Sequence, residues 1–209
     1  MRQPQLSGPV IAILMVAAAS MVASQVRSRS AAAHSLRWQG PFEYVREFGS
    51  SAPGCSYRGR ETVEATVVCE GGDLRHLQCT ASGKASHVYR EELLQQDGRT
   101  ASRHDAADYE GALKADYDTH VTQGVDLFRL DVGTNLPVKY ERIAGGATRT
   151  GEYALDVSGS TRDLVFVPQN GRLERRRVEP IYEPGPAACA IQGRFNGTES
   201  LAMRLLPAE

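Results

Sequence analysis

Residues 62–81 read TVEATVVCEGGDLRHLQCTA, and this stretch decides the fold class. On both sides of Gly71-Gly72-Asp73, apolar residues alternate with polar ones, which is typical of two half-buried strands joined by a turn. A loop of these three residues would pair Cys69 with Arg75 and would place the apolar side chains on one face, as a half-buried sheet requires. The stretch therefore predicts an antiparallel β-hairpin.

The same alternation recurs along the rest of the chain. Short apolar runs, broken by glycine, proline or asparagine, follow one another at a spacing of roughly 8–12 residues, which is typical of an antiparallel sandwich or barrel. We therefore predict a mainly β fold, a single antiparallel sandwich or half-barrel of about ten short strands. Residues 105–114 are the exception, because their alanines and early acidic residues predict one short helix.

The cysteines indicate the compartment. They are Cys55, Cys69, Cys79 and Cys189, and none forms a Cys-x-x-Cys pair, which argues against a zinc ribbon or a thioredoxin-like site. An even number after a secretory leader predicts two disulfides and an oxidising environment.

In the register of the three-residue loop, Cys69 and Cys79 would lie about 13 Å apart along the ladder, at ~3.3 Å per residue. A disulfide needs Cα atoms within ~7 Å. Pairing of Cys69 with Cys79 is therefore disfavoured, and each is expected to pair with Cys55 or Cys189.

The amino-terminal region has the features of a leader. The apolar run from Pro9 to Ala23 is 15 residues long, which suits a signal peptide and is short of the ~20 residues of a membrane span. We expect a signal peptide at 1–24, a flexible tether at 25–40 and a β-rich extracytoplasmic domain at 41–209. Basic residues follow the apolar run, so an uncleaved anchor through residues 9–26 is the alternative.

Composition and charge narrow the function classes. The chain has 209 residues, of which 41% are hydrophobic and 23% charged, close to a soluble globular average and unlike a disordered, collagenous or multi-span membrane protein. It carries 24 basic and 25 acidic side chains, for a net charge of −1. Because there is no basic excess, nucleic acid is not an expected partner.

One acidic segment is a candidate metal site. On an extended chain Asp116, Asp118 and His120 would point to one face, where two carboxylates and an imidazole could hold a divalent ion. Their spacing lacks the glycine and the later glutamate of an EF-hand, so a solvated acidic segment is favoured. The chain also lacks a Gly-x-Ser-x-Gly elbow and a glycine-rich phosphate loop. We predict no catalytic residues and no cofactor.

Two further motifs are candidates for binding or modification. Arg172, Arg175, Arg176 and Arg177 could form a patch for an anionic partner, or a charged sheet edge that prevents aggregation. Asn196 begins an Asn-Gly-Thr sequon, which could carry a glycan in a host with an N-glycosylating secretory pathway or could serve as a turn.

One segment resembles a known family. Residues 130–141 read LDVGTNLPVKYE, which is similar to the D-x-x-T-x-L-P-V strand–turn–strand of periplasmic lipoprotein-carrier and sigma-regulator-like half-barrels. The resemblance covers these twelve residues, and it implies a half-barrel with a hydrophobic ligand cavity. It identifies no binding residue.

These features favour a secreted or periplasmic binding protein without catalytic activity. Its ligand would be a small apolar or lipid molecule or a protein partner, and its oligomeric state is open. The first alternative is a membrane-tethered structural or interaction protein of the cell envelope. The second is a metal-dependent hydrolase that uses Asp116, Asp118 and His120.

Overall fold

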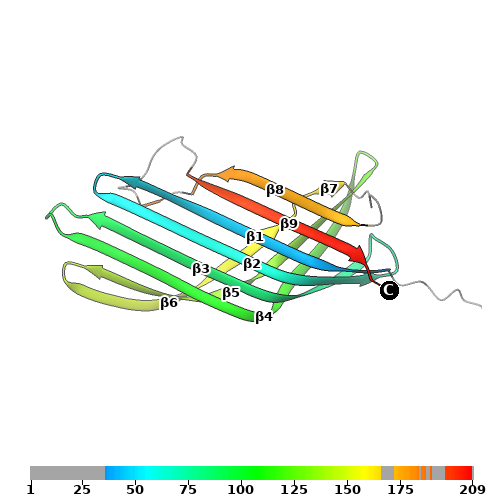
Figure 1. Cartoon of the computed structure of the whole chain (residues 1–209), viewed down its shortest axis with the longest axis horizontal. Coiled ribbons are helices and arrows are strands. Elements are labelled where there is room, and N and C mark those ends of the chain that lie inside the picture. Colours follow the sequence, from blue (N-terminus) through cyan, green and yellow to red (C-terminus); the bar gives the residue numbers. More distant parts are fainter. Residues whose placement is uncertain (1–35, 166–171, 184, 187–188, 190–195, 209) are drawn as a thin grey trace, which may run out of the picture. The chain divides into compact units, whose positions relative to one another are not determined.

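The structure is a computed structural model that describes residues 36–165, 172–183, 185–186, 189 and 196–208 (Figure 1). These residues form nine strands of one antiparallel sheet and no α-helix, so the predicted mainly β class is confirmed. The strands are fewer and longer than expected, up to 23 residues. They are β1 (Leu36–Ala52), β2 (Cys55–Gly71), β3 (Leu77–Leu94), β4 (Thr100–Thr122), β5 (Val125–Ala144), β6 (Ala147–Ser160), β7 (Leu164–Val165), β8 (Leu173–Ile181) and β9 (Gly197–Pro207).

The sheet is a meander to which a second hairpin is added. Each strand from β1 to β6 pairs with the next, and the spatial order is β6-β5-β4-β3-β2-β1-β9-β8, with the short β7 paired to β5. Strand β9 lies beside β1, so the carboxyl-terminal hairpin extends the sheet at its start. Figure 1 shows β4, β3, β2, β1, β9 and β8 side by side as one layer.

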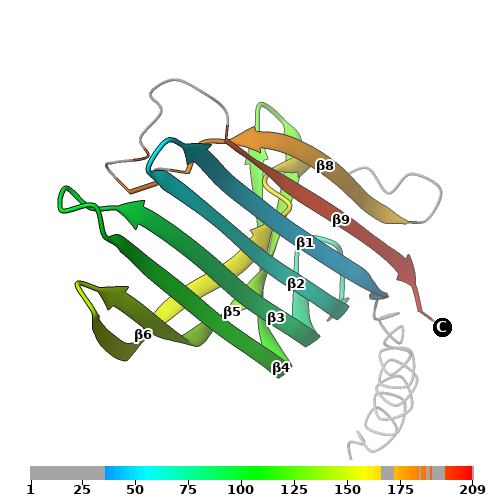
Figure 2. The same ribbon diagram turned by 60° about the vertical axis from the view of Figure 1, so that its left-hand side comes forward.

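The sheet bends back on itself where β4 meets β5. Their ladder shifts register between Ala106 and Lys114, so that residues 107–113 of β4 lie opposite the shorter stretch 134–138 of β5. Extra residues in one strand bend a ladder and increase its twist. Figure 2 shows the result, in which the first part of β5 and the last part of β6 pass behind β1 and β2.

Side chains fill the space between the two layers. Alternate residues of each strand point inward, and the following are at most 2% exposed: Phe42, Val63, Val67, Leu130, Val132, Leu136, Val138, Val157, Leu201, Met203 and Leu205. Burial of each such side chain contributes roughly 1.5–3 kcal/mol. We call the side of the sheet that carries these buried side chains the inner face. The opposite, solvent-facing side of the β8-β9-β1-β2-β3-β4 layer is the outer face.

The helix predicted at 105–114 is wrong, because these residues lie within β4. Ladders to β3 and β5 hold the strand on both sides, and such tertiary pairing overrides a weak helix propensity. Asp105, expected in the first helical turn, is 1% exposed. It accepts hydrogen bonds from Arg103, at 2.8 and 2.6 Å, and from the Tyr153 hydroxyl, at 2.7 Å.

The register expected for the first hairpin is also wrong, and with it the disfavoured disulfide. The loop is residues 72–76, held by Asp73, whose carboxylate accepts the Arg75 backbone N–H at 2.8 Å. Cys69 then lies opposite Cys79 instead of Arg75, with Cα atoms 4.0 Å apart, and the two form a disulfide. The partner moves by four residues, an even number, so the predicted inward faces of both strands are kept.

The second disulfide joins β2 to the segment between β8 and β9. Cys55 and Cys189 have Cα atoms 5.5 Å apart and are 134 residues apart in sequence. Two disulfides indicate an oxidising environment.

The segment 130–141 differs from the strand–turn–strand that its resemblance implied. It lies within β5 and runs without a turn through Gly133 and Asn135. Strand β1 begins at Leu36, so residues 36–40 of the expected tether belong to the sheet. The predicted signal peptide, the anchor and the rest of the tether lie outside the described residues. Within the described part of the chain, no helical segment has the length and apolarity for a membrane span.

Candidate functional site

The proposed metal ligands lie on one exposed face of β4 but each has a different partner. Asp116 pairs with Lys114 at 2.5 Å, Asp118 with Arg129 at 3.8 Å and His120 with Asp163 at 3.7 Å. Among the residues with a described placement, no group of three His, Cys, Asp or Glu side chains could hold a metal ion.

The arginines of β8 do not form one patch. Arg177 is on the inner face with its side chain 3% exposed, where it pairs with Glu199 and, at 2.9 Å, with Glu179. It also donates to the backbone oxygen of Ser160 at 3.1 Å, so it joins the edge strand β8 to the end of β6. This side chain is therefore not available to a partner.

The other three arginines have different surroundings. Arg172 pairs with Glu174 at 3.1 Å, Arg175 is half-buried on the inner side and Arg176 is exposed on the outer face. Arg175 and Arg176 line one small hollow with Arg204, and binding of an anionic partner by this cluster stays a prediction.

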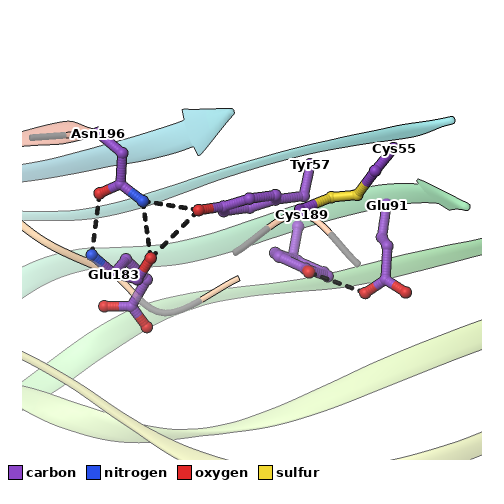
Figure 3. The surroundings of a disulfide bond; sticks show 7 residues. Cys55, Tyr57, Glu91, Glu183, Cys189 and Asn196 are labelled. Carbon is purple, nitrogen blue, oxygen red and sulfur yellow. Dashed lines mark hydrogen bonds between the residues drawn. A yellow bond between two sulfur atoms is a disulfide. The ribbon is translucent and has the colours of Figure 1, made fainter. Parts of the chain in front are cut away.

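Asn196 holds the segment that follows β8. Its amide nitrogen donates to the Tyr57 hydroxyl at 2.6 Å and to the Glu183 backbone oxygen at 2.7 Å, and its oxygen accepts the Glu183 N–H at 2.9 Å (Figure 3). Tyr57 lies between this hydrogen-bonded group and the Cys55–Cys189 disulfide. The amide nitrogen, to which a glycan would be linked, is occupied in the folded chain, and glycosylation stays a prediction.

Asn196 also borders a hollow that the sequence did not predict. It is a cavity of about 790 Å³ on the outer face, over one end of β9, β1, β2 and β3, and we call it the arginine groove. Its lining residues are Glu47, Phe48, Arg58, Gly59, Arg60, Val88, Arg90, Asn196, Gly197 and Thr198. Pockets of about 300–1,000 Å³ are the usual size for small ligands.

The strand register brings the three arginines together. Arg58 lies directly opposite Arg90 in the β2–β3 ladder, and Arg60 lies opposite Val88. Directly opposed residues have Cβ atoms about 4.5–5.5 Å apart, and like charges there are destabilising. Val88 is 40% exposed, so it gives the groove an apolar surface between the charges.

The charges of the groove are unbalanced. Arg60 pairs with Glu47 at 3.4 Å, in an exposed contact. Among the described residues, neither Arg58 nor Arg90 has an ion-pair or hydrogen-bond partner. The groove therefore presents two guanidinium groups beside each other that have no partner among the described residues, in a protein whose net charge is −1.

Buried charges lie directly beneath the groove, on the inner face. Arg46 is opposite Glu61, and Glu61 is opposite His87, so these three are the inward neighbours of Glu47, Arg60 and Val88. The Arg46 guanidinium is 3.3 Å from the Glu61 carboxylate and also pairs with Glu183.

Glu61 is the centre of this buried group. One of its carboxylate oxygens lies 3.5 Å from Nδ1 of His87, which is too long for a good hydrogen bond but close enough for attraction when the ring is protonated. Burial alone would raise the pKa of Glu61, but the neighbouring His87 and Arg46 hold it below its ordinary value. The carboxylate stays ionised and fixes the three strands that carry the groove.

A second arginine site on the inner face is already satisfied. The guanidinium of Arg103 lies 5.7–5.8 Å from the ring centres of Tyr89, Tyr140 and Tyr153, and it binds Asp105 through two hydrogen bonds. Rings and carboxylate compensate the charge, so this cluster stabilises the sheet and offers less to a ligand than the groove.

The arginine groove could not be found without the register. Arg58 and Arg90 are far apart in sequence, and the three-residue loop expected for the hairpin would have placed Ser86 opposite Arg58. The alternation Arg58-x-Arg60 was the one local signal. No protein-family model, curated protein or solved structure matches this chain.

Proposed function

We propose that this protein is an extracytoplasmic binding protein, secreted or periplasmic, which holds an acidic group of its partner in the arginine groove without converting it chemically. The observation that carries the proposal is the directly opposed pair of Arg58 and Arg90 at the wall of the 790 Å³ hollow, neither of which has an ion-pair partner in the part of the chain that the structure describes. Two like charges directly opposed on an exposed sheet cost free energy, and an anion bound between them would remove that cost.

The chemistry of the side chains supports binding. A guanidinium group presents a planar fork of donors that matches carboxylate and phosphate groups, and it stays protonated throughout the physiological pH range. Arginines therefore hold an anion but do not take or give a proton.

The scaffold supports a site outside the cytoplasm. Both disulfides join elements that carry the groove, since Cys55 and Cys69 are in β2. Such cross-links are kept in oxidising compartments. A protein tethered to the membrane could carry the same surface, so the location of the chain is a separate question from its binding.

The proposal is tested by titrating the disulfide-bonded protein with inorganic phosphate and with hexaglutamate, and hexalysine serves as the control ligand. We expect hexaglutamate to bind and hexalysine not to bind. Replacing both Arg58 and Arg90 by serine should weaken hexaglutamate binding at least tenfold, because charge-assisted hydrogen bonds contribute about 1.5–3 kcal/mol.

A matched control is available at the other end of the sheet. Arg142 and Arg149 are also directly opposed and exposed, but they do not line the groove. The Arg142→Ser/Arg149→Ser protein should bind hexaglutamate within twofold of the parent. Equal losses in the two double variants, or no anion binding by the parent, would contradict the proposal.

A further inference from the structure

The outer face carries an acidic pair as well as a basic one. Glu43 in β1 lies directly opposite Glu64 in β2, and both are exposed. Neither forms an ion pair among the residues that the structure describes, although Glu64 has Lys84 opposite it on β3. Lys84 in turn pairs with Glu110 at 3.5 Å. Glu43 and Glu64 repel each other across the β1–β2 ladder, and Lys84 offsets this repulsion for Glu64.

The two pairs are separated along β2 by a distance that the register fixes. Arg58 and Glu64 are six residues apart on the same face, which corresponds to about 20 Å. The outer face therefore carries the arginine pair at one end and the acidic pair at the other, where Lys84 and Arg176 are also exposed.

A strip of small and aliphatic side chains lies between the charged pairs. Its members are Val45, Thr62, Ser86, Val88 and Ser200, which are neighbours across β9, β1, β2 and β3. The Thr62 and Ser86 hydroxyls are 2.7 Å apart and hydrogen-bond each other, so the strip does not need water to satisfy them. Such a strip can be covered without leaving buried polar groups unpaired.

From this pattern we infer that the acidic partner of the arginine groove is a second copy of this chain. A two-fold axis that lies in the plane of the interface, runs across the strands and passes midway between the pairs places Arg58 and Arg90 of one copy on Glu43 and Glu64 of the other, and the reverse. Contacts of this kind are isologous and form closed dimers. The inference rests on the proposed function, because it names the partner of the same groove.

The size of the face is sufficient for such an interface. Six strands, each about 4.8 Å from the next, and a length of about 30 Å along residues 58–66 give roughly 850 Å² on each copy. Stable interfaces bury about 800 Å² on each partner. The small net charge of −1 also leaves little overall repulsion between copies.

The test is a charge exchange followed by sedimentation velocity over a range of concentrations. The parent full chain should form dimers that dissociate at least tenfold more readily in 1 M salt, because exposed charges are screened there. The Arg58→Glu/Arg90→Glu variant and the Glu43→Arg/Glu64→Arg variant should each be monomeric. An equimolar mixture of the two should form a heterodimer, and this recovery also shows that both variants are folded.

The control is Arg142→Glu/Arg149→Glu, which should dimerise like the parent. A parent that stays monomeric at millimolar concentration overturns the inference, and if it still binds hexaglutamate through Arg58 and Arg90 the proposed function survives. Variants that remain dimeric, or a mixture that stays monomeric, also overturn the dimer. Failure of both dimerisation and anion binding removes the inference and the proposed function together.

Discussion

Removal of the two disulfides one at a time tests the connectivity and the topology together. The Cys55–Cys189 bond closes a loop of 134 residues, whereas the Cys69–Cys79 bond closes a loop of 10. In the chain-entropy model, a cross-link stabilises a protein by reducing the freedom of the unfolded chain, and the effect grows with the logarithm of the loop length. The long loop then contributes about 5 kcal/mol and the short one about 2.7 kcal/mol.

Alanine replaces both cysteines of a pair, so that each variant loses one cross-link and no free thiol is left. Cys55, Cys69 and Cys189 are at most 5% exposed, and Cys79 packs against the core. The packing losses are therefore of similar kind in the two variants. The free energy of unfolding, measured by urea denaturation of the oxidised proteins, should fall about 2 kcal/mol further in Cys55→Ala/Cys189→Ala than in Cys69→Ala/Cys79→Ala.

Non-reducing peptide mapping of the parent protein is the companion measurement. It should recover Cys69 linked to Cys79 and Cys55 linked to Cys189. A peptide that links Cys69 to Cys189 would refute the register of the first hairpin. Equal stability losses in the two variants would refute the assignment of the long loop to the segment between β8 and β9.

Three other perturbations follow from the inner face. Glu61→Gln should lower the free energy of unfolding by about 1.5–3 kcal/mol at pH 7. Because the native pKa of Glu61 is below its ordinary 4.5, the difference between variant and parent should persist above pH 4.5 and shrink as the pH falls through the native pKa. A difference that is unchanged down to pH 2 would exclude a stabilising role of the ionised carboxylate. Gly59→Ala should destabilise the protein by about 1–3 kcal/mol, since a Cβ atom there would lie 2.2 Å from the Phe48 ring. Gly72 has open space around it, so the control Gly72→Ala should change the melting temperature little. Similar melting temperatures for the two variants would contradict the packing of Phe48 on Gly59. Arg177→Gln should lower the free energy of unfolding by about 3–5 kcal/mol, because the half-buried carboxylate of Glu199 loses its main partner. The control Arg176→Gln, at an exposed neighbouring position, should lower it by less than about 0.5 kcal/mol in the same urea experiment. Equal losses in the two variants would show that Arg177 does not join β8 to β6.

The fold class could be predicted from the sequence because it depends on local alternation. In β2, Val63, Ala65, Val67 and Cys69 face inward and the residues that alternate with them face outward, and this pattern is independent of which strand is the neighbour. The prediction of a short helix at 105–114 was wrong for the opposite reason, because here distant contacts outweigh the local pattern. Alanine and early acids favour a helix locally, but β4 is held between two long ladders, and a strand in that position gains more from pairing than its residues lose in propensity.

Register and bending could not be predicted, because both depend on contacts between distant residues. A loop of three or of five residues gives the hairpin at 62–81 the same inward faces, so the alternation does not choose between them. The choice is made by the loop, where Asp73 accepts the N–H groups of Arg75 and His76. The bend between β4 and β5 arises from unequal lengths of two strands, which no pattern within one strand records.

The same uncertainty in register hid the candidate site, and this has a physical reason. Exposed positions on a sheet tolerate almost any side chain. The outer residues of β2 and β3 therefore show no hydrophobic pattern from which their cross-strand neighbours could be predicted. Arg58 and Arg90 become informative only when they are known to be opposed and to line the same hollow, which distinguishes them from the opposed and exposed Arg142 and Arg149. Glu43 and Glu64 form a like-charge pair of the opposite sign on the same face. In the dimer that we propose, each like-charge pair would face the complementary pair of the other copy, and association would remove the repulsion within both pairs.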